Sequence, residues 1–119
     1  MNAEEIIKLK KTALYSSLES SDKFCKFFNK SILHNAVVME IFSNNNKLGI
    51  SYEKLCLNIP KTLGSRSSIQ NLLNEGLDKK ILIKLENSND KRIKNYYLSD
   101  DFAQMVVEWI KKQKIIFNT

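Results

Sequence analysis

The stretch NSNDKRIKNYYLSDD occupies residues 87–101 and follows the run KKILIKLE at residues 79–86. Apolar residues alternate with more polar neighbours on both sides of a polar segment. These alternating residues are Ile81, Ile83 and Leu85 before the segment and Tyr96 and Leu98 after it. A period of two is typical of β-strands, so the sequence predicts a two-stranded hairpin with a polar, basic tip at residues 87–91.

A helix is predicted immediately before the hairpin, in SRSSIQNLLNEGLDKKI at residues 65–81. Its apolar residues recur with a helical period and are expected to be buried. They are Ile69, Leu72, Leu73, Leu77 and Ile81. The outer face is then polar and consists of Arg66, Ser67, Gln70, Asn71 and Asn74.

A shorter helix is predicted in SYEKLCLNI at residues 51–59, where Ser51 can act as the N-cap. Leu55 and Ile59 would face inward. Pro60 ends this helix because proline has no backbone N–H and disfavours helical geometry in the residue before it.

Helices are also predicted towards both ends of the chain. Residues 4–18 carry an apolar stripe, and residues 20–22 interrupt it before a second apolar set of Phe24, Phe27 and Phe28. Ser31 can cap a third helix that ends in the turn at residues 44–46. Its inward face is expected to carry Ile32, Leu33, Ala36, Met39 and Phe42. After the hairpin, Ser99 can cap a last helix with Asp100 and Asp101 in its first turn.

The predicted order is helix, helix, short helix, turn, helix, hairpin, helix. A helix-turn-helix followed at once by a basic hairpin is the winged-helix layout, in which the second helix of the pair enters the major groove of DNA. We therefore expect a mainly α fold with a small β-hairpin, formed by a single domain over residues 1–119. Its parts would be an N-terminal dimerisation region (1–30), the winged helix-turn-helix (31–98) and a C-terminal dimerisation helix (99–119).

Composition suggests an acidic partner, either nucleic acid or an anionic membrane surface, and disfavours several other classes of protein. The formal net charge is +6, although 17 of the 19 basic residues are lysine, as an AT-rich genome would produce without selection for binding. Cys25 and Cys56 are too few for a disulfide framework. The start of the chain lacks the apolar core of a signal peptide, and no apolar run reaches membrane-spanning length, so we expect a cytoplasmic protein without a membrane partner.

The helix after Pro60 offers groups suited to double-stranded DNA. Ser65, Ser67 and Ser68 lie at its N-terminus, where free N–H groups and the helix dipole favour a phosphate. Arg66 can reach a phosphate or a guanine edge. Gln70 and Asn71 have the paired donor and acceptor that match adenine, and Asn74 shares their face. The alternative is that Ser65 only caps the helix and that the two amides are ordinary solvated residues.

The hairpin tip would act as the wing. Lys91 and Arg92 can extend beside the duplex, and arginine is favoured in a narrow minor groove. Asp90 is expected to hold Arg92 or the turn backbone. Both arginines of the chain, Arg66 and Arg92, fall where a winged helix touches DNA. Phosphates would be neutralised by Lys61, Arg66, Lys91, Arg92 and Lys94.

An enzymatic role is not expected. His34 is the only histidine and lies in an apolar helical run, and no cysteine or carboxylate has the spacing of a shared site. No cofactor or metal is predicted. Cys25, between Lys23 and Lys26, is either a redox-sensitive thiol or a residue packed beside Phe24 and Phe28.

Residues 32–102 resemble the MarR group of bacterial winged-helix regulators. Asp90-Lys91-Arg92 matches that group's Asp-any-Arg wing, and Leu98-Ser99 matches the Leu-Thr step that opens its next helix. The resemblance implies a symmetric dimer joined by terminal helices, with Arg92 in the minor groove. The predicted dimer residues are Ile7, Leu14, Phe102, Met105, Val106, Trp109, Ile110 and Phe117.

The chain also departs from the MarR pattern. Phe102 stands where that group usually has glycine, and one helix follows the wing where two are common, which puts the dimer arrangement and effector pocket in doubt. A single terminal helix is similar to TubR-type plasmid centromere-binding proteins. The expected function is transcriptional repression, with alternatives of partition-site binding beside a tubulin-like filament protein or a protein-interaction module. A small-molecule effector is a further partner that the MarR resemblance suggests.

Overall fold

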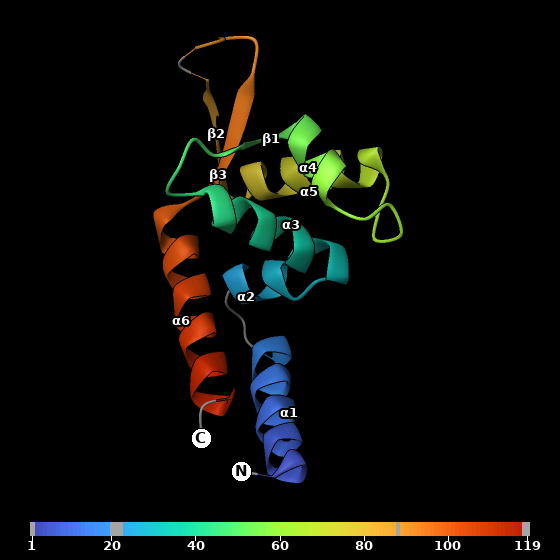
Figure 1. Ribbon diagram of the computed structural model, residues 1–119, viewed down its shortest axis with the longest axis vertical. Coiled ribbons are helices and arrows are strands. Elements are labelled where there is room, and N and C mark those ends of the chain that lie inside the picture. Colours follow the sequence, from blue (N-terminus) through green and yellow to red (C-terminus); the bar gives the residue numbers. More distant parts are fainter. Residues whose placement is uncertain (1, 20–22, 88, 118–119) are drawn as a thin grey trace.

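The computed structural model describes residues 2–19, 23–87 and 89–117, with side chains described except at residues 13, 14, 16–19 and 112–117. Figure 1 shows a body of short helices with the hairpin projecting at one end and the terminal helices side by side at the other. The elements are α1 (Ala3–Glu19), α2 (Lys23–Phe28), α3 (Ile32–Asn44), β1 (Ile50–Ser51), α4 (Tyr52–Asn58), α5 (Arg66–Asp78), β2 (Leu82–Glu86), β3 (Lys94–Leu98) and α6 (Asp100–Phe117). The predicted order of helices and hairpin is confirmed except at the start, where three helices rather than two precede the short helix α4. Within the described residues, no helix is long and apolar enough to cross a membrane.

Serine side chains begin four of the helices, as predicted. The hydroxyls of Ser31, Ser51 and Ser65 accept hydrogen bonds of 3.1 to 3.2 Å from the backbone N–H three residues later. Ser99 caps α6 by accepting from the backbone of Phe102 at 3.3 Å. Each bond satisfies an N–H that has no partner inside its helix, so these starts are fixed by local chemistry.

The sheet contains one strand more than the sequence predicted. Its order is β1-β3-β2, all antiparallel, and β1 pairs Ile50 with Tyr96. A two-residue strand cannot show an alternating pattern, which is why this strand was not predicted.

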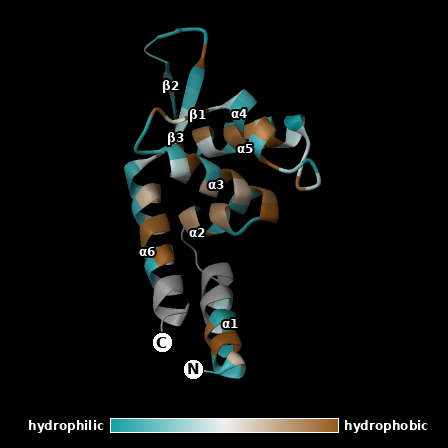
Figure 2. Ribbon diagram, viewed as in Figure 1, coloured by the Kyte–Doolittle hydropathy of each residue, from teal (hydrophilic) through white to brown (hydrophobic). Residues whose placement is uncertain are grey.

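The hairpin buries different side chains from those expected. Leu82 is buried opposite Leu98, whereas Ile83 and Leu85 are exposed. Ile81 is buried ahead of the strand, and its carbonyl accepts from the backbone of Ser99 at 2.9 Å. The hairpin extends beyond the helices, so only its base can pack against the core. Figure 2 shows the resulting hydrophilic tip.

The inward face of α3 also differs from the prediction. Val37, Val38 and Ile41 are buried, while Ile32 and Met39 are 73% and 45% exposed. Nearly every position from Ala36 to Phe42 is apolar, so periodicity cannot indicate which side faces the core. Leu33 and Phe42 pack against the core at its edge.

Helix α6 closes the core of the single chain. The ring of Phe102 stacks on Phe24 at 5.6 Å and meets Phe27 edge-on at 6.0 Å, and Trp109 meets Phe28 at 5.1 Å. Phe102 and Val106 are fully buried in one chain, which corrects their assignment to a dimer seam. Met105 and Trp109 are half-buried against the same core. The side chains of Leu14 and Phe117 lie outside the described residues.

Gly49 allows the turn between α3 and β1. Its φ is 71°, a conformation that costs an L-residue about 1 to 2 kcal/mol. A Cβ at Gly49 would lie 2.7 Å from Cζ of Tyr97 and 3.0 Å from the carbonyl oxygen of Tyr96. This position therefore lacks both the conformational freedom and the space for a side chain.

We expect Gly49→Ala to lower the free energy of unfolding by about 1 to 2 kcal/mol, through the left-handed backbone alone and more if the Tyr97 ring cannot move. Urea denaturation measures this change. Lys47→Ala is the matched control, because Lys47 is exposed in the same turn. Equal stability of Gly49→Ala and the wild type would contradict the strain at this turn.

Candidate nucleic-acid interface

Helices α4 and α5 form the helix-turn-helix. Leu55 and Ile59 are buried, and the backbone of Leu63 donates to the carbonyl of Pro60 at 3.0 Å in the turn between the helices. At the start of α5, the hydroxyl of Ser65 lies 3.1 Å from that of Ser67 and 3.0 Å from that of Ser68. All three serines are exposed. These hydroxyls therefore gather at a helix N-terminus, where an anion is favoured.

Arg66 is held by neighbours on α4. Its guanidinium donates to Glu53 Oε1 at 2.6 Å and lies 5.2 Å from the ring centre of Tyr52. The hydroxyl of Tyr52 donates to the carbonyl of Arg66 at 2.9 Å. The hydrogen bond to Glu53 raises the pKa of the guanidinium, so Arg66 remains charged and has a preferred orientation. The sequence analysis did not predict the role of Glu53, because nothing local links residues 13 positions apart.

The three amides on the outer face of α5 have different surroundings. Gln70 is half-buried and donates to Asn74 Oδ1 at 3.1 Å. Asn71 is exposed, and within the described part of the chain its side chain has no hydrogen-bond partner. Of the two residues proposed to read adenine, the structure therefore leaves only Asn71 with a complete amide edge.

The wing tip is organised by Asp90, as predicted. Its carboxylate accepts from the Arg92 backbone at 3.0 Å and from Nε and Nη2 of the Arg92 side chain at 3.1 Å each. These bonds lower the pKa of Asp90 and raise that of Arg92. The Arg92 side chain is 90% exposed, so Asp90 orients the guanidinium without covering it.

The lysines of the candidate surface divide into two kinds. Lys94 is paired across the hairpin with Glu86 at 2.7 Å. Lys61 and Lys91 are exposed and form no ion pair with any other described residue. Lys61 and Lys91 can therefore bind a phosphate without first breaking an ion pair with a carboxylate.

No protein-family model and no curated protein sequence matches the chain. Solved structures do resemble it. The S. aureus MepR-DNA complex is 14% identical, with 98% of this chain and 82% of MepR covered at a TM-score of 0.63. YusO from Bacillus subtilis is 15% identical, with 98% and 82% covered at 0.54. The heme sensor protein PefR, in complex with heme and carbon monoxide, is 18% identical, with 97% and 76% covered at 0.54.

The chain has a MarR-like winged-helix fold. We call α5, the second helix of this helix-turn-helix, the recognition helix and the β2–β3 hairpin the wing, as these elements are named in the winged-helix fold. At these identities the likeness concerns the fold, and the comparisons give no support to the TubR resemblance.

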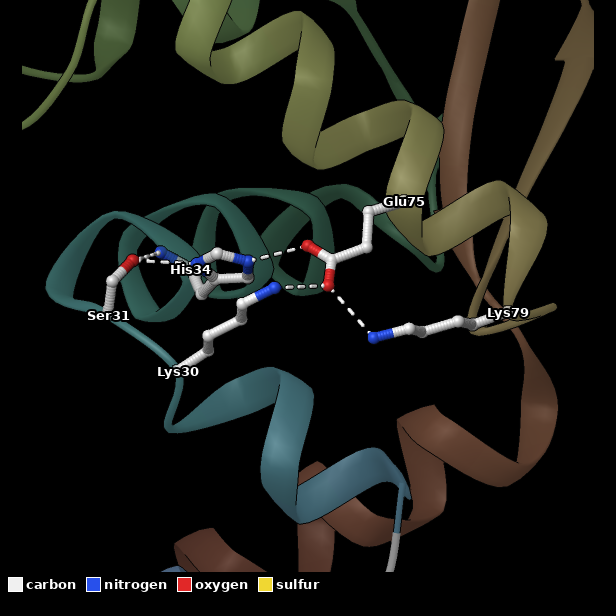
Figure 3. A network of polar contacts seen from close by, with 5 residues as sticks. All are labelled: Lys30, Ser31, His34, Glu75 and Lys79. Carbon is white, nitrogen blue, oxygen red and sulfur yellow. Dashed lines mark hydrogen bonds and ion pairs between the residues drawn. The ribbon is translucent and has the colours of Figure 1, made fainter.

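A charged network holds the recognition helix of the MarR-like domain to α3 and to the turn that precedes it. Figure 3 shows Glu75 on α5 surrounded by Lys30, His34 and Lys79. One carboxylate oxygen accepts from Nε2 of His34 at 3.0 Å, and the other contacts Lys30 at 2.7 Å and Lys79 at 2.9 Å. The other ring nitrogen of His34 lies 2.6 Å from the hydroxyl of Ser31. His34 is thus a buried side chain that links Ser31 to Glu75.

The network lowers the pKa of the Glu75 carboxyl group. Partial burial raises its pKa, but hydrogen bonds from His34, Lys30 and Lys79 outweigh burial and lower the pKa from 4.5 to about 2. Because the folded-state pKa lies below the ordinary value, the network stabilises the fold above about pH 4.5 and loses this effect as the pH falls towards 2. Within the described residues, no group of three or more His, Cys, Asp or Glu side chains could hold a metal ion.

We expect Glu75→Gln to lower the free energy of unfolding near neutral pH by on the order of 3 kcal/mol, the equivalent of the depressed pKa. The difference from the wild type should shrink as the pH falls from about 4.5 to 2. Urea denaturation between pH 2 and pH 7 measures it. Glu108→Gln, which removes an exposed carboxylate on α6, is the control. A difference that does not depend on pH would contradict the role of the Glu75 charge.

Proposed function

We propose that the protein binds double-stranded DNA in a sequence-specific manner as a dimer and acts as a transcriptional repressor. The observation that carries the proposal is the exposed polar face of α5, from Ser65 to Asn74, presented together with a wing that carries Lys91 and Arg92. A helix of this kind fits the major groove, and a basic hairpin beside it can reach the backbone or minor groove of the same duplex. A MarR-like fold solved with DNA, that of MepR, supports the assignment.

The charges of this surface suit contacts to phosphate. Lys61 and Lys91 are exposed cations, and Arg92 is extended from the wing. Arg66, Arg92 and Lys94 carry their own carboxylate partners, which a phosphate would have to replace or join. The affinity should therefore fall with salt, with a slope that reflects the free lysines most directly.

Dimerisation is supported by apolar surface on the terminal helices. Ile7 and Tyr15 on α1 are 57% and 53% exposed, and Ile110 on α6 is 41% exposed. These helices extend away from the wing, where a second chain could cover them (Figure 1). A two-fold dimer would present two recognition helices to half-sites of an inverted repeat, and a bound repeat that overlaps a promoter would block transcription.

Other partners remain predictions. PefR is described with heme and MepR has been solved with ethidium bromide, but these ligands belong to those proteins. A small-molecule effector of this chain, a redox response of Cys25 and a filament partner in plasmid partition have no supporting observation in the structure.

Two alanine variants separate the proposed contacts to phosphate and to bases. Arg92→Ala should weaken binding to all DNA and reduce the dependence of log affinity on log salt concentration by about one. Asn71→Ala should weaken only the cognate site, by about 1 to 3 kcal/mol, because it removes an amide that can pair with adenine. Fluorescence anisotropy on cognate and random duplexes at several salt concentrations measures both effects.

The cognate duplex for this experiment comes from selection of genomic fragments by the purified protein. Lys84→Ala provides a control for Arg92, since Lys84 is an exposed cation on the body of the same hairpin. Equal losses on cognate and random DNA for Asn71→Ala would remove the base-reading role. Absence of any selected fragment would favour the interaction-module alternative.

Ile7→Glu should disrupt the dimer, because burial of a carboxylate in an apolar seam is unfavourable. We expect the mass in solution to fall from twice 13.8 kDa towards 13.8 kDa, as measured by light scattering after size exclusion. Ser43→Glu adds the same charge to an exposed position of α3 and should leave the mass unchanged. A wild-type mass of 13.8 kDa at micromolar concentration would contradict the dimer.

A further inference from the structure

Gln70 and Asn74 form a pair on the outer face of α5 in which one amide restricts the other. The side-chain nitrogen of Gln70 donates to Asn74 Oδ1 at 3.1 Å, one helical turn along the face. Gln70 is half-buried, whereas Asn74 is exposed. Gln70 is therefore the inner member of the pair and Asn74 the outer member, and only Asn74 is exposed enough to contact a ligand with its whole side chain.

The pKa of a phenol on the wing supports this orientation of the inner member. Tyr96 on β3 is buried, and burial raises the pKa of its hydroxyl while a hydrogen bond with Gln70 lowers it. An amide lowers the pKa of a phenol when its N–H donates to the phenol oxygen. This direction agrees with the donation by the Gln70 nitrogen to Asn74 Oδ1. If the Gln70 oxygen took the place of that nitrogen, it would face the Asn74 oxygen with no hydrogen between them.

The orientation of Gln70 decides what Asn74 presents. Since Oδ1 of Asn74 accepts from Gln70, the outward group is its Nδ2, which carries two hydrogens and no lone pair to accept with. A complete asparagine amide pairs with adenine, through one donor and one acceptor. A group that only donates instead fits O6 and N7 of guanine or O4 of thymine, and it conflicts with the N4 amino group of cytosine.

We propose that Gln70 is a positioning residue that turns Asn74 into a donor-only reader, so that one base pair of the target is selected for guanine or thymine. This inference rests on the proposed DNA-binding function and adds the base class read at one position. It also assigns different preferences to neighbouring amides, because Asn71 keeps both halves of its amide and can read adenine.

The test is selection from a random double-stranded library, followed by sequencing, with the wild type and four variants. Asn74→Ala identifies the position as the one where the preference disappears. In Gln70→Glu the new carboxylate can only accept, so Asn74 should donate to it and turn its oxygen outward. The preference at that position should then change to cytosine or adenine, with a change of about tenfold in relative affinity.

Asn74→Asp tests the same relation from the other side. Gln70 would donate to one carboxylate oxygen, and the second oxygen would face outward as an acceptor, so this variant should show the same change of preference. Both variants add a negative charge near DNA and should lower affinity for all sequences, which does not affect the comparison between bases. Asn71→Ala is the matched control and should alter a different position. Thermal melting followed by circular dichroism confirms that each variant is folded.

The outcomes separate the positioning role from DNA binding itself. If the wild type selects a motif and both acidic variants keep the wild-type base at the Asn74 position, the positioning role is overturned and DNA binding stands. A loss of affinity with no change in base preference at that position has the same meaning, since only the change in preference distinguishes the positioning role from the effect of the added charge. If the wild type enriches no sequence, the proposed function fails, and this inference fails with it.

Discussion

The close approach of the recognition helix to the base of the wing is the constraint on which the rest of the domain depends. A Cβ at Gly76 would lie 2.5 Å from Cδ1 of Leu82 and 3.3 Å from the ring of Phe27, so α5 can pass the start of β2 only with a hydrogen at this position. Leu82 in turn pairs with Leu98, next to the serine that caps α6. One contact thereby fixes α5, the hairpin and the terminal helix relative to one another. A protein that touches two grooves of one duplex needs such a fixed distance between its helix and its wing.

Around this constraint, the charged side chains of the candidate interface are organised by carboxylates. Glu53 orients Arg66, Asp90 orients Arg92, and Glu75 connects α5 to Lys30 and His34. A guanidinium that is already oriented loses less conformational freedom on binding than a free one. The net charge of +6 does not describe how these cations are oriented, and selectivity depends on that orientation.

Much of the candidate site could be predicted because its signals are local. The serine caps, the stop at Pro60 and the Asp90–Arg92 wing all involve residues within a few positions of each other. The partners of these residues could not be predicted in the same way. Glu53 is 13 residues from Arg66, and His34 is 41 residues from Glu75, so only the folded chain brings them together. The same limit applies to Gln70, which lowers the pKa of Tyr96 on the distant strand β3.

The sequence by itself determined most of the order of the helices, their starting residues and the hairpin. These features follow from capping, proline stereochemistry and periodicity, which act over one or two turns of chain. Only the tertiary structure decided the β1 strand, the buried face of α3, the inclusion of Phe102 and Val106 in the core, and which amides are free. Those features depend on packing and pairing between segments that are far apart in sequence. Helix α3 is apolar around most of its circumference, so its sequence does not indicate which side will be covered by the rest of the protein.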